Sequence, residues 1–93
     1  MVINIGDIAD LLSVCTNRRT GALVDPGAMS VRVTFPDTTQ VTYTTVSSPP
    51  VVRESLGLYS LALPATQSGR HIARFIGTGA NAGVEEIPYD VMP

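Results

Sequence analysis

Apolar and polar residues alternate along much of this 93-residue chain, and that alternation constrains its fold more than any other feature. From Met29 to Pro36, valine and phenylalanine occupy every second position, with serine, arginine and threonine between them. Successive side chains of a β-strand point to opposite faces, whereas one face of a helix repeats about every 3.6 residues. The segment therefore predicts a strand that buries one face.

Similar segments recur along the chain between turns rich in glycine and proline. Pro36-Asp37 opens a turn after which residues 40–46 resume the alternation, so these two segments predict a hairpin. Strands about every 8–12 residues are typical of an all-β sandwich or barrel, and a seven-strand immunoglobulin-like sandwich has roughly 100 residues. The sequence predicts one domain over residues 1–93, an immunoglobulin-like β-sandwich of about seven antiparallel strands. The other expected strands are 7–17, 51–55, 57–63, 70–76 and 84–91.

Prolines predict which strands lie at sheet edges. Pro49 and Pro50 supply no N–H donors, so 47–50 is expected to be a stiff loop followed by a short edge strand at 51–55. Pro88 likewise favours an edge position for 84–91.

The segment Asp7–Asn17 fits two structures. As a strand it would point Ile8, Leu12 and Val14 into the core. As a short helix capped by Asp7 it would gather apolar residues at helical spacing. Those residues are Ile8, Leu11, Leu12 and Cys15. The strand is preferred because an isolated first strand fits the rest of the pattern.

Residues that could support catalysis are few and scattered. His71 is the only histidine and Cys15 the only cysteine, so no intramolecular disulfide can form. A nucleophilic mechanism needs a serine or cysteine beside an oriented base, and no serine lies in a Gly-x-Ser-x-Gly turn. We expect no catalytic residue, no enzymatic activity and no small-molecule substrate. His71 is expected to be a strand histidine, and Cys15 a small buried apolar residue.

Metal and cofactor sites are equally unsupported. One histidine and one cysteine cannot complete a tetrahedral zinc site within one chain. Glu85 and Glu86 are adjacent on an expected strand, so their carboxylates point to opposite faces. Gly77-Thr78-Gly79 with Gly83 lacks the lysine and following helix of a phosphate-binding loop. We therefore expect a flexible loop at 77–83, no cofactor and no bound metal.

Charge and hydropathy exclude two classes of partner. The formal net charge is −2 and the isoelectric point about 5.0, and the only positive side chains are arginines. A nucleic-acid surface would need a basic stripe, which these scattered residues do not form. They are Arg18, Arg19, Arg32, Arg53, Arg70 and Arg74. No apolar run approaches the roughly 18 residues of a membrane-spanning helix. Met1–Ile5 lacks the features of a signal peptide, so synthesis in a cytoplasm is expected, with no membrane partner.

Both faces of the strand expected at 70–76 carry apolar side chains. His71, Ala73 and Phe75 share one face, and isoleucines flank Arg74 on the other. Either another molecule covers one face, or the loops of a twisted sandwich cover part of both, or the inward and outward faces are assigned the wrong way round. The predicted interface residues are Ile72, Arg74, Ile76, Leu58 and Val52.

Several turn and strand motifs have a recognisable order. They are Gly6-Asp7, Val24-Asp25-Pro26, Val31-x-Val33-x-Phe35-Pro36-Asp37, Arg53-Glu54-Ser55-x-Gly57-x-Tyr59, Ser68-Gly69-Arg70 and Arg74-Phe75-Ile76-Gly77-Thr78-Gly79. Their order and spacing resemble those of small immunoglobulin-like proteins of tailed bacteriophages. The sequence departs from that group where Asn4-Ile5 replaces a proline, Thr38 a turn glycine and Phe75 a tryptophan.

The resemblance implies a structural component of a virion, made in the bacterial host cytoplasm. A capsid decoration or cement protein is the first expectation, with the major capsid or connector protein and symmetry-related copies of itself as partners. The alternatives are a head–tail connector, a tail component, or a glycan- or host-recognition module of a larger surface assembly. The matching positions determine the fold, so no functional residue is implied by the resemblance.

Overall fold

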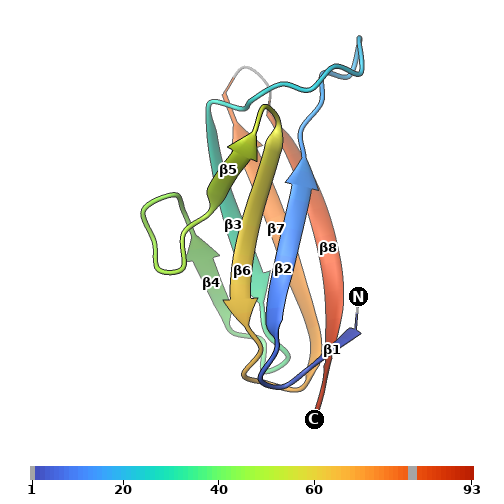
Figure 1. Cartoon of the computed structure of the whole chain (residues 1–93), viewed down its shortest axis with the longest axis vertical. Helices are drawn as coiled ribbons and strands as arrows, with labels where there is room; N and C mark the ends of the chain where they lie inside the picture. The colour runs from blue at the N-terminus through green and yellow to red at the C-terminus, as the bar shows by residue number, and fades with distance from the viewer. Residues whose placement is uncertain (1, 80–81) are drawn as a thin grey trace.

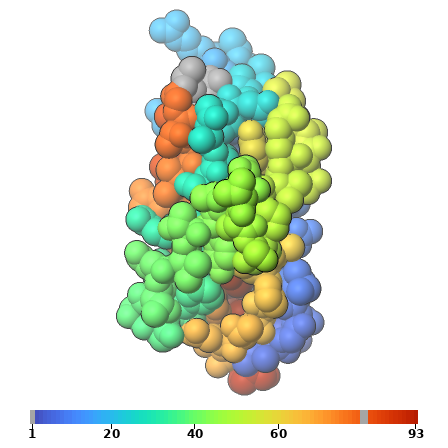
Figure 2. All heavy atoms as spheres, turned by 90° about the vertical axis from the view of Figure 1, so that its left-hand side faces the viewer, coloured from blue at the N-terminus to red at the C-terminus, as the bar shows by residue number. Residues whose placement is uncertain are grey.

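Two β-sheets packed face to face form the molecule in a computed structural model that describes residues 2–79 and 82–93 (Figure 1). The described residues contain eight strands: β1 (Val2–Asn4), β2 (Ile8–Val14), β3 (Ala28–Thr34), β4 (Gln40–Tyr43), β5 (Val52–Ser55), β6 (Leu58–Pro64), β7 (Gly69–Thr78) and β8 (Gly83–Met92). They include no helix that is long and apolar enough to cross a membrane. The connection between β4 and β5 projects from one side of the sandwich (Figures 1 and 2).

The strand order is that of an immunoglobulin-like sandwich. One sheet has the order β1-β8-β7-β3-β4, and the other has the order β2-β6-β5. The chain changes sheets after β1, β2, β4 and β6, and the remaining connections form antiparallel hairpins. This arrangement confirms the predicted all-β, immunoglobulin-like class.

The strand count and direction differ from the prediction at the start of the chain. Val2–Asn4 forms an additional strand that pairs parallel to Asp90–Met92 of β8, so the larger sheet is mixed. Three residues are too few to display an alternating pattern. Their pairing is set by the end of β8, far away in sequence.

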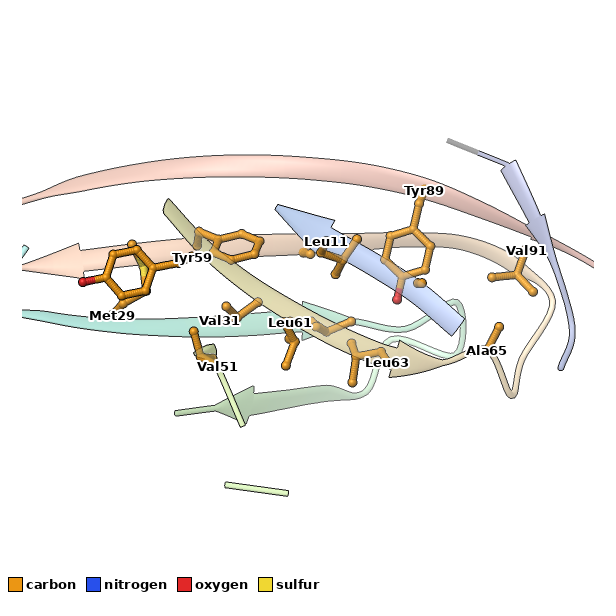
Figure 3. Packing of buried hydrophobic residues seen from close by; sticks show 14 residues of the cluster. Leu11, Met29, Val31, Val51, Tyr59, Leu61, Leu63, Ala65, Tyr89 and Val91 are labelled. Atoms are coloured by element: carbon orange, nitrogen blue, oxygen red, sulfur yellow. The ribbon is translucent and has the colours of Figure 1, made fainter. Parts of the chain in front are cut away.

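The core lies where the alternating residues of both sheets meet (Figure 3). In the predicted hairpin, β3 and β4 pair antiparallel, with Val31 opposite Tyr43 and Val33 opposite Val41. Alternate residues that share one face of β3, β6 and β7 are buried. They are Val31, Val33, Tyr59, Leu61, Leu63, His71, Ala73 and Phe75. The period of two is therefore present in the burial of these strands, although Ser60, on the other face of β6, is buried as well.

Prolines predicted the edge position of β5 correctly and that of β8 only in part. β5 is an outer strand of the three-stranded sheet, as expected. β8 lies between β7 and β1, but β1 reaches only Asp90–Met92. Among the described residues Pro88 therefore has a sheet neighbour on one side only, which is an edge-like position for a residue without an N–H donor.

For segment 7–17 the strand prediction is confirmed, the helical alternative is wrong, and the predicted inward face is wrong. Ala9, Leu11 and Ser13 are buried, whereas Ile8, Leu12 and Val14 are exposed. Both faces of this strand carry aliphatic side chains, so alternation alone does not identify the buried one. Pairing with β6 decides it, because Leu11 is in register with the buried Leu61.

The turn between β3 and β4 contains a strained residue. Thr38 has φ of 73°, the only positive φ of a non-glycine residue in ranges 2–79 and 82–93. A left-handed conformation costs a residue with a Cβ about 1–2 kcal/mol, whereas glycine adopts it freely. Thr38→Gly is expected to raise the free energy of unfolding by roughly 0.5–1 kcal/mol, because unfolded-state entropy offsets part of the relief. Chemical denaturation measures this change.

The neighbouring threonine is the matched control. Thr39 donates its backbone N–H and its hydroxyl to the Asp37 carboxylate, and its φ is not positive. Thr39→Gly removes the hydroxyl contact and relieves no strain, so it is expected to lower stability. A lower stability for Thr38→Gly as well would contradict the strain argument.

Candidate interaction surface

Motifs far apart in sequence meet at Asp25, in the connection between β2 and β3. The Arg53 side chain on β5 donates to the Asp25 carboxylate from Nε at 3.0 Å and from Nη2 at 2.9 Å. The backbone N–H of Gly57, in the β5–β6 turn, donates to Asp25 Oδ1 at 2.8 Å. These donors, Arg53 foremost, hold the pKa of Asp25 below its usual value. These contacts fix the β2–β3 connection against the β5–β6 hairpin, so their role is structural.

Glycines of the quoted motifs lie where chain segments approach closely. A Cβ added to Gly57 would lie 2.7 Å from the backbone oxygen of Cys15. Gly27 donates its N–H to the carbonyl of Thr78 at 2.6 Å, and a Cβ on Gly79 would lie 3.0 Å from the Gly27 Cα. Gly77-Thr78-Gly79 thus packs against the β2–β3 connection. Of the loop predicted at 77–83, Ala80 and Asn81 lie outside the described residues.

His71 is a core residue with 2% of its surface exposed. Its ring stacks on Tyr89 with centroids 4.8 Å apart and meets the edge of Phe35 at 5.4 Å. Its Nδ1 lies 3.3 Å from the carbonyl oxygen of Gly69. Within residues 2–79 and 82–93, no three histidine, cysteine, aspartate or glutamate side chains gather at a metal-binding distance. The half-buried Cys15 lies just beyond the end of β2.

Burial of Tyr89 makes the stability of the domain sensitive to alkaline pH. Loss of hydration raises the pKa of Tyr89 from 10.0 to about 12. The folded state therefore keeps the phenol protonated while the unfolded chain releases its proton from about pH 10 upward. Between these two pKa values, stability should fall by up to about 1.4 kcal/mol per pH unit.

Denaturant titrations of the wild type and Tyr89→Phe at about pH 9 and about pH 11 measure this loss. The difference between the two proteins isolates Tyr89 from the other tyrosines. Burial also raises the pKa of Tyr43 and Tyr59, so the variant retains part of the alkaline loss. An equal loss in the two proteins would contradict the assigned burial of Tyr89.

The five predicted interface residues occupy two opposite surfaces. Ile72, Arg74 and Ile76 lie on the outer face of the five-stranded sheet, because β7 buries the alternate residues. Leu58 and Val52 lie on the outer face of the three-stranded sheet, where Val52 pairs with Ser60. The sandwich core separates the two groups, so they do not form one patch.

The outer face of the five-stranded sheet is largely polar. Arg74 is in register with Arg32 on β3 and with Glu86 on β8. The Nε atom of Arg74 is buried and has no hydrogen-bond partner among the described residues. Arg70 and Asp90 form an ion pair at 3.1 Å on the same face. Two aligned arginines on adjacent strands repel each other, which disfavours burying this face in an apolar contact.

The outer face of the three-stranded sheet is more apolar. Register places Val14 beside Leu58, and Leu12 beside Ser60, which in turn pairs with Val52. We call the residues Ile8, Leu12, Val14, Val52 and Leu58 the apolar face. Four of its members are 43–58% exposed. The three β2 residues of this face are those that the sequence pattern wrongly placed in the core.

Two of the clefts in the part of the chain that the structure describes open at the sides of the sandwich. The larger, about 400 Å³, lies between β3 and β5 and is lined by Met29, Thr44, Arg53 and Tyr59 among others. The smaller, about 190 Å³, lies between β2 and β8 and has Phe75 in its wall. Ligand sites usually reach 300–1,000 Å³ and hold convergent polar groups. In the larger cleft the charged side chain, Arg53, is already paired with Asp25.

Comparisons with known proteins describe the fold alone. No protein-family model matches the chain, and no curated protein matches its sequence. Among solved structures, the crystal structure of the ZIG-8–RIG-5 IG1–IG1 heterodimer is similar, with a TM-score of 0.49 and 17% sequence identity. That similarity covers 99% of this chain and 82% of the other.

Proposed function

We propose that this chain is a non-enzymatic structural protein of a tailed-phage particle, and first of all a decoration or cement protein of its capsid. Its partners are the major capsid or connector protein and symmetry-related copies of itself, and its location is the virion. The motifs that carry the resemblance to phage immunoglobulin-like proteins support this proposal. In these motifs the Asp25 carboxylate accepts hydrogen bonds from Arg53 and Gly57, and these contacts stabilise the fold.

The apolar face is the observation that most supports a protein-binding role. Five aliphatic residues are gathered on one side of a thin sandwich, and Ile8, Leu12 and Val14 are each more than half exposed. Exposed apolar patches of this kind mark protein contacts. Each copy offers only a modest contact, but a lattice of neighbouring copies multiplies weak contacts through effective concentration. A small domain whose described residues include no cluster of metal-binding side chains suits that role.

Quantitative mass spectrometry of purified particles tests the proposal. We expect the chain in intact virions, at on the order of hundreds of copies for a decoration role or about a dozen for a connector ring. A copy number near a dozen would therefore replace decoration with the connector alternative. Absence from intact virions would overturn the proposal.

A further inference from the structure

The strand β2 exposes a long unprotected edge. Among the described residues it pairs with β6 alone, and Figure 1 shows it at the right-hand edge of the front sheet. Its seven residues, Ile8–Val14, include no proline, glycine, lysine or arginine, and Asp10 is its single charge. Natural proteins usually blunt such edges with short strands, bulges, prolines or charges, because a free edge pairs with another strand.

The other edges of the two sheets carry such protection. β1 has three residues, and β4 and β5 have four each. β5 also contains a register shift between Arg53 and Ser55. The unpaired stretch of β8 holds Glu85, Glu86 and Pro88. Within residues 2–79 and 82–93, β2 is therefore the edge best suited to pair with a further strand.

The hydrogen bonds at both ends of β2 show which backbone groups face outward. The Ala65 N–H donates to the Asp7 carbonyl at 2.9 Å, and the Cys15 N–H donates to the Gly57 carbonyl at 2.7 Å. Pairing between these ends is continuous, and alternate residues of an antiparallel strand face the neighbour. The residues of opposite parity therefore direct N–H and C=O to the free edge. They are Ile8, Asp10, Leu12 and Val14.

We propose that β2 pairs antiparallel with β2 of a second copy, joining the two three-stranded sheets across a twofold axis. The register that overlaps the whole strand sets Ile8 opposite Val14 of the other copy and Asp10 opposite Leu12. All four residues have outward backbone groups, so each pairing exchanges hydrogen bonds. The two Asp10 carboxylates are not directly opposite, and a net charge of −2 per copy adds little repulsion.

A second copy suits this edge because the pairing also extends the apolar face. A twofold axis perpendicular to the joined sheet keeps both outer faces on the same side. The aliphatic residues of two copies then lie on one surface twice as wide, with the Asp10–Leu12 pairs at its centre. The inference rests on the proposed function, in which copies assemble side by side on a particle, and names the contact between them.

Sedimentation of the isolated protein up to about 1 mM, the effective concentration that tethered neighbours reach, tests the pairing. A monomer–dimer equilibrium is expected. Leu12→Asp places two like charges opposite each other and should weaken the dimer at least tenfold. Leu12→Lys places opposite charges there and should leave the dimer at least as tight as the wild type. Thr42→Asp, on the outer face of the other sheet, should leave it unchanged.

Amide exchange followed by NMR locates the contact. The N–H groups of Ile8, Asp10, Leu12 and Val14 should exchange rapidly in dilute protein and become protected as dimer forms. A protein that stays monomeric at about 1 mM would overturn the proposal. Equal weakening of the dimer by Leu12→Asp and Leu12→Lys would overturn it as well. Binding of a strand from another protein to a persistently monomeric chain would assign the edge to a different occupant and also overturn it. Association with virions is measured separately, so failure of the pairing and failure of the virion role are distinguishable.

Discussion

Leu11→Ala is expected to lower the free energy of unfolding by about 3 kcal/mol, within the 2–5 kcal/mol range of buried leucine truncations. Leu11 is 1% exposed, lies in register with Leu61 of the same sheet, and belongs to the buried cluster between the two sheets. Its removal leaves a cavity that close-packed neighbours fill only in part. Domains have total stabilities of only about 5–15 kcal/mol, so the substitution would remove a large share of the free energy of unfolding. Urea denaturation measures the loss.

The adjacent leucine is an internal control. Leu12 is 51% exposed on the opposite face of the same strand, so Leu12→Ala should cost less than about 1 kcal/mol in the monomer. The pair compares identical substitutions one residue apart and differs only in the direction of the side chain. A larger loss of unfolding free energy for Leu12→Ala than for Leu11→Ala would mean that Leu12 points inward, as the sequence predicted. The apolar face would then not exist as described.

Gly57→Ala is expected to destabilise the fold by about 3 kcal/mol or more. Gly57 has φ of 71°, and an added Cβ would approach the Cys15 carbonyl, the Val24 carbonyl and the Leu23 Cβ at 2.7, 3.1 and 3.2 Å. Two of these three atoms belong to the backbone, so relief requires shifting the β2–β3 connection. That shift would also separate the Gly57 N–H from Asp25. Thermal and urea unfolding both report the change.

Gly21→Ala measures the cost of the left-handed conformation without the steric contacts that a Cβ at Gly57 would make. Gly21 has φ of 72°, almost the same value, but no atom lies within 4 Å of its added Cβ. The left-handed conformation alone should cost about 1 kcal/mol. Equal losses at both glycines would show that the close approach at Gly57 contributes nothing, and would contradict the structural role given to the Asp25 contacts.

The sequence predicted the strands and the class of fold because period-two alternation and turn residues are local signals. Val31 and Val33 could be placed inward because serine, arginine and threonine occupy the opposite face of their strand. β2 offered no such contrast, since Leu11 and Leu12 are equally apolar. Only its pairing with β6, about fifty residues away, decides which of the two is buried.

The placement of the proposed interface residues on the two sheets could not be predicted for the same reason. Ile72 and Leu58 were correctly identified as apolar residues outside the core, but no local pattern indicates that they lie on opposite sheets. Likewise, Val2–Asn4 becomes a strand through β8, and the open edge of β2 exists because β1 pairs with the other sheet. These features depend on topology, which alternation does not encode.

The central claim is that this chain acts through its apolar face, and binding to particles that lack the protein tests it most directly. Wild-type protein should bind such particles saturably, at a fixed number of copies. A variant with Val52→Asp and Leu12→Asp should unfold like the wild type in a monomer control yet bind at least tenfold more weakly, while Thr42→Asp binds normally. Failure of the wild type to bind, or equal binding by the double variant, would contradict the claim.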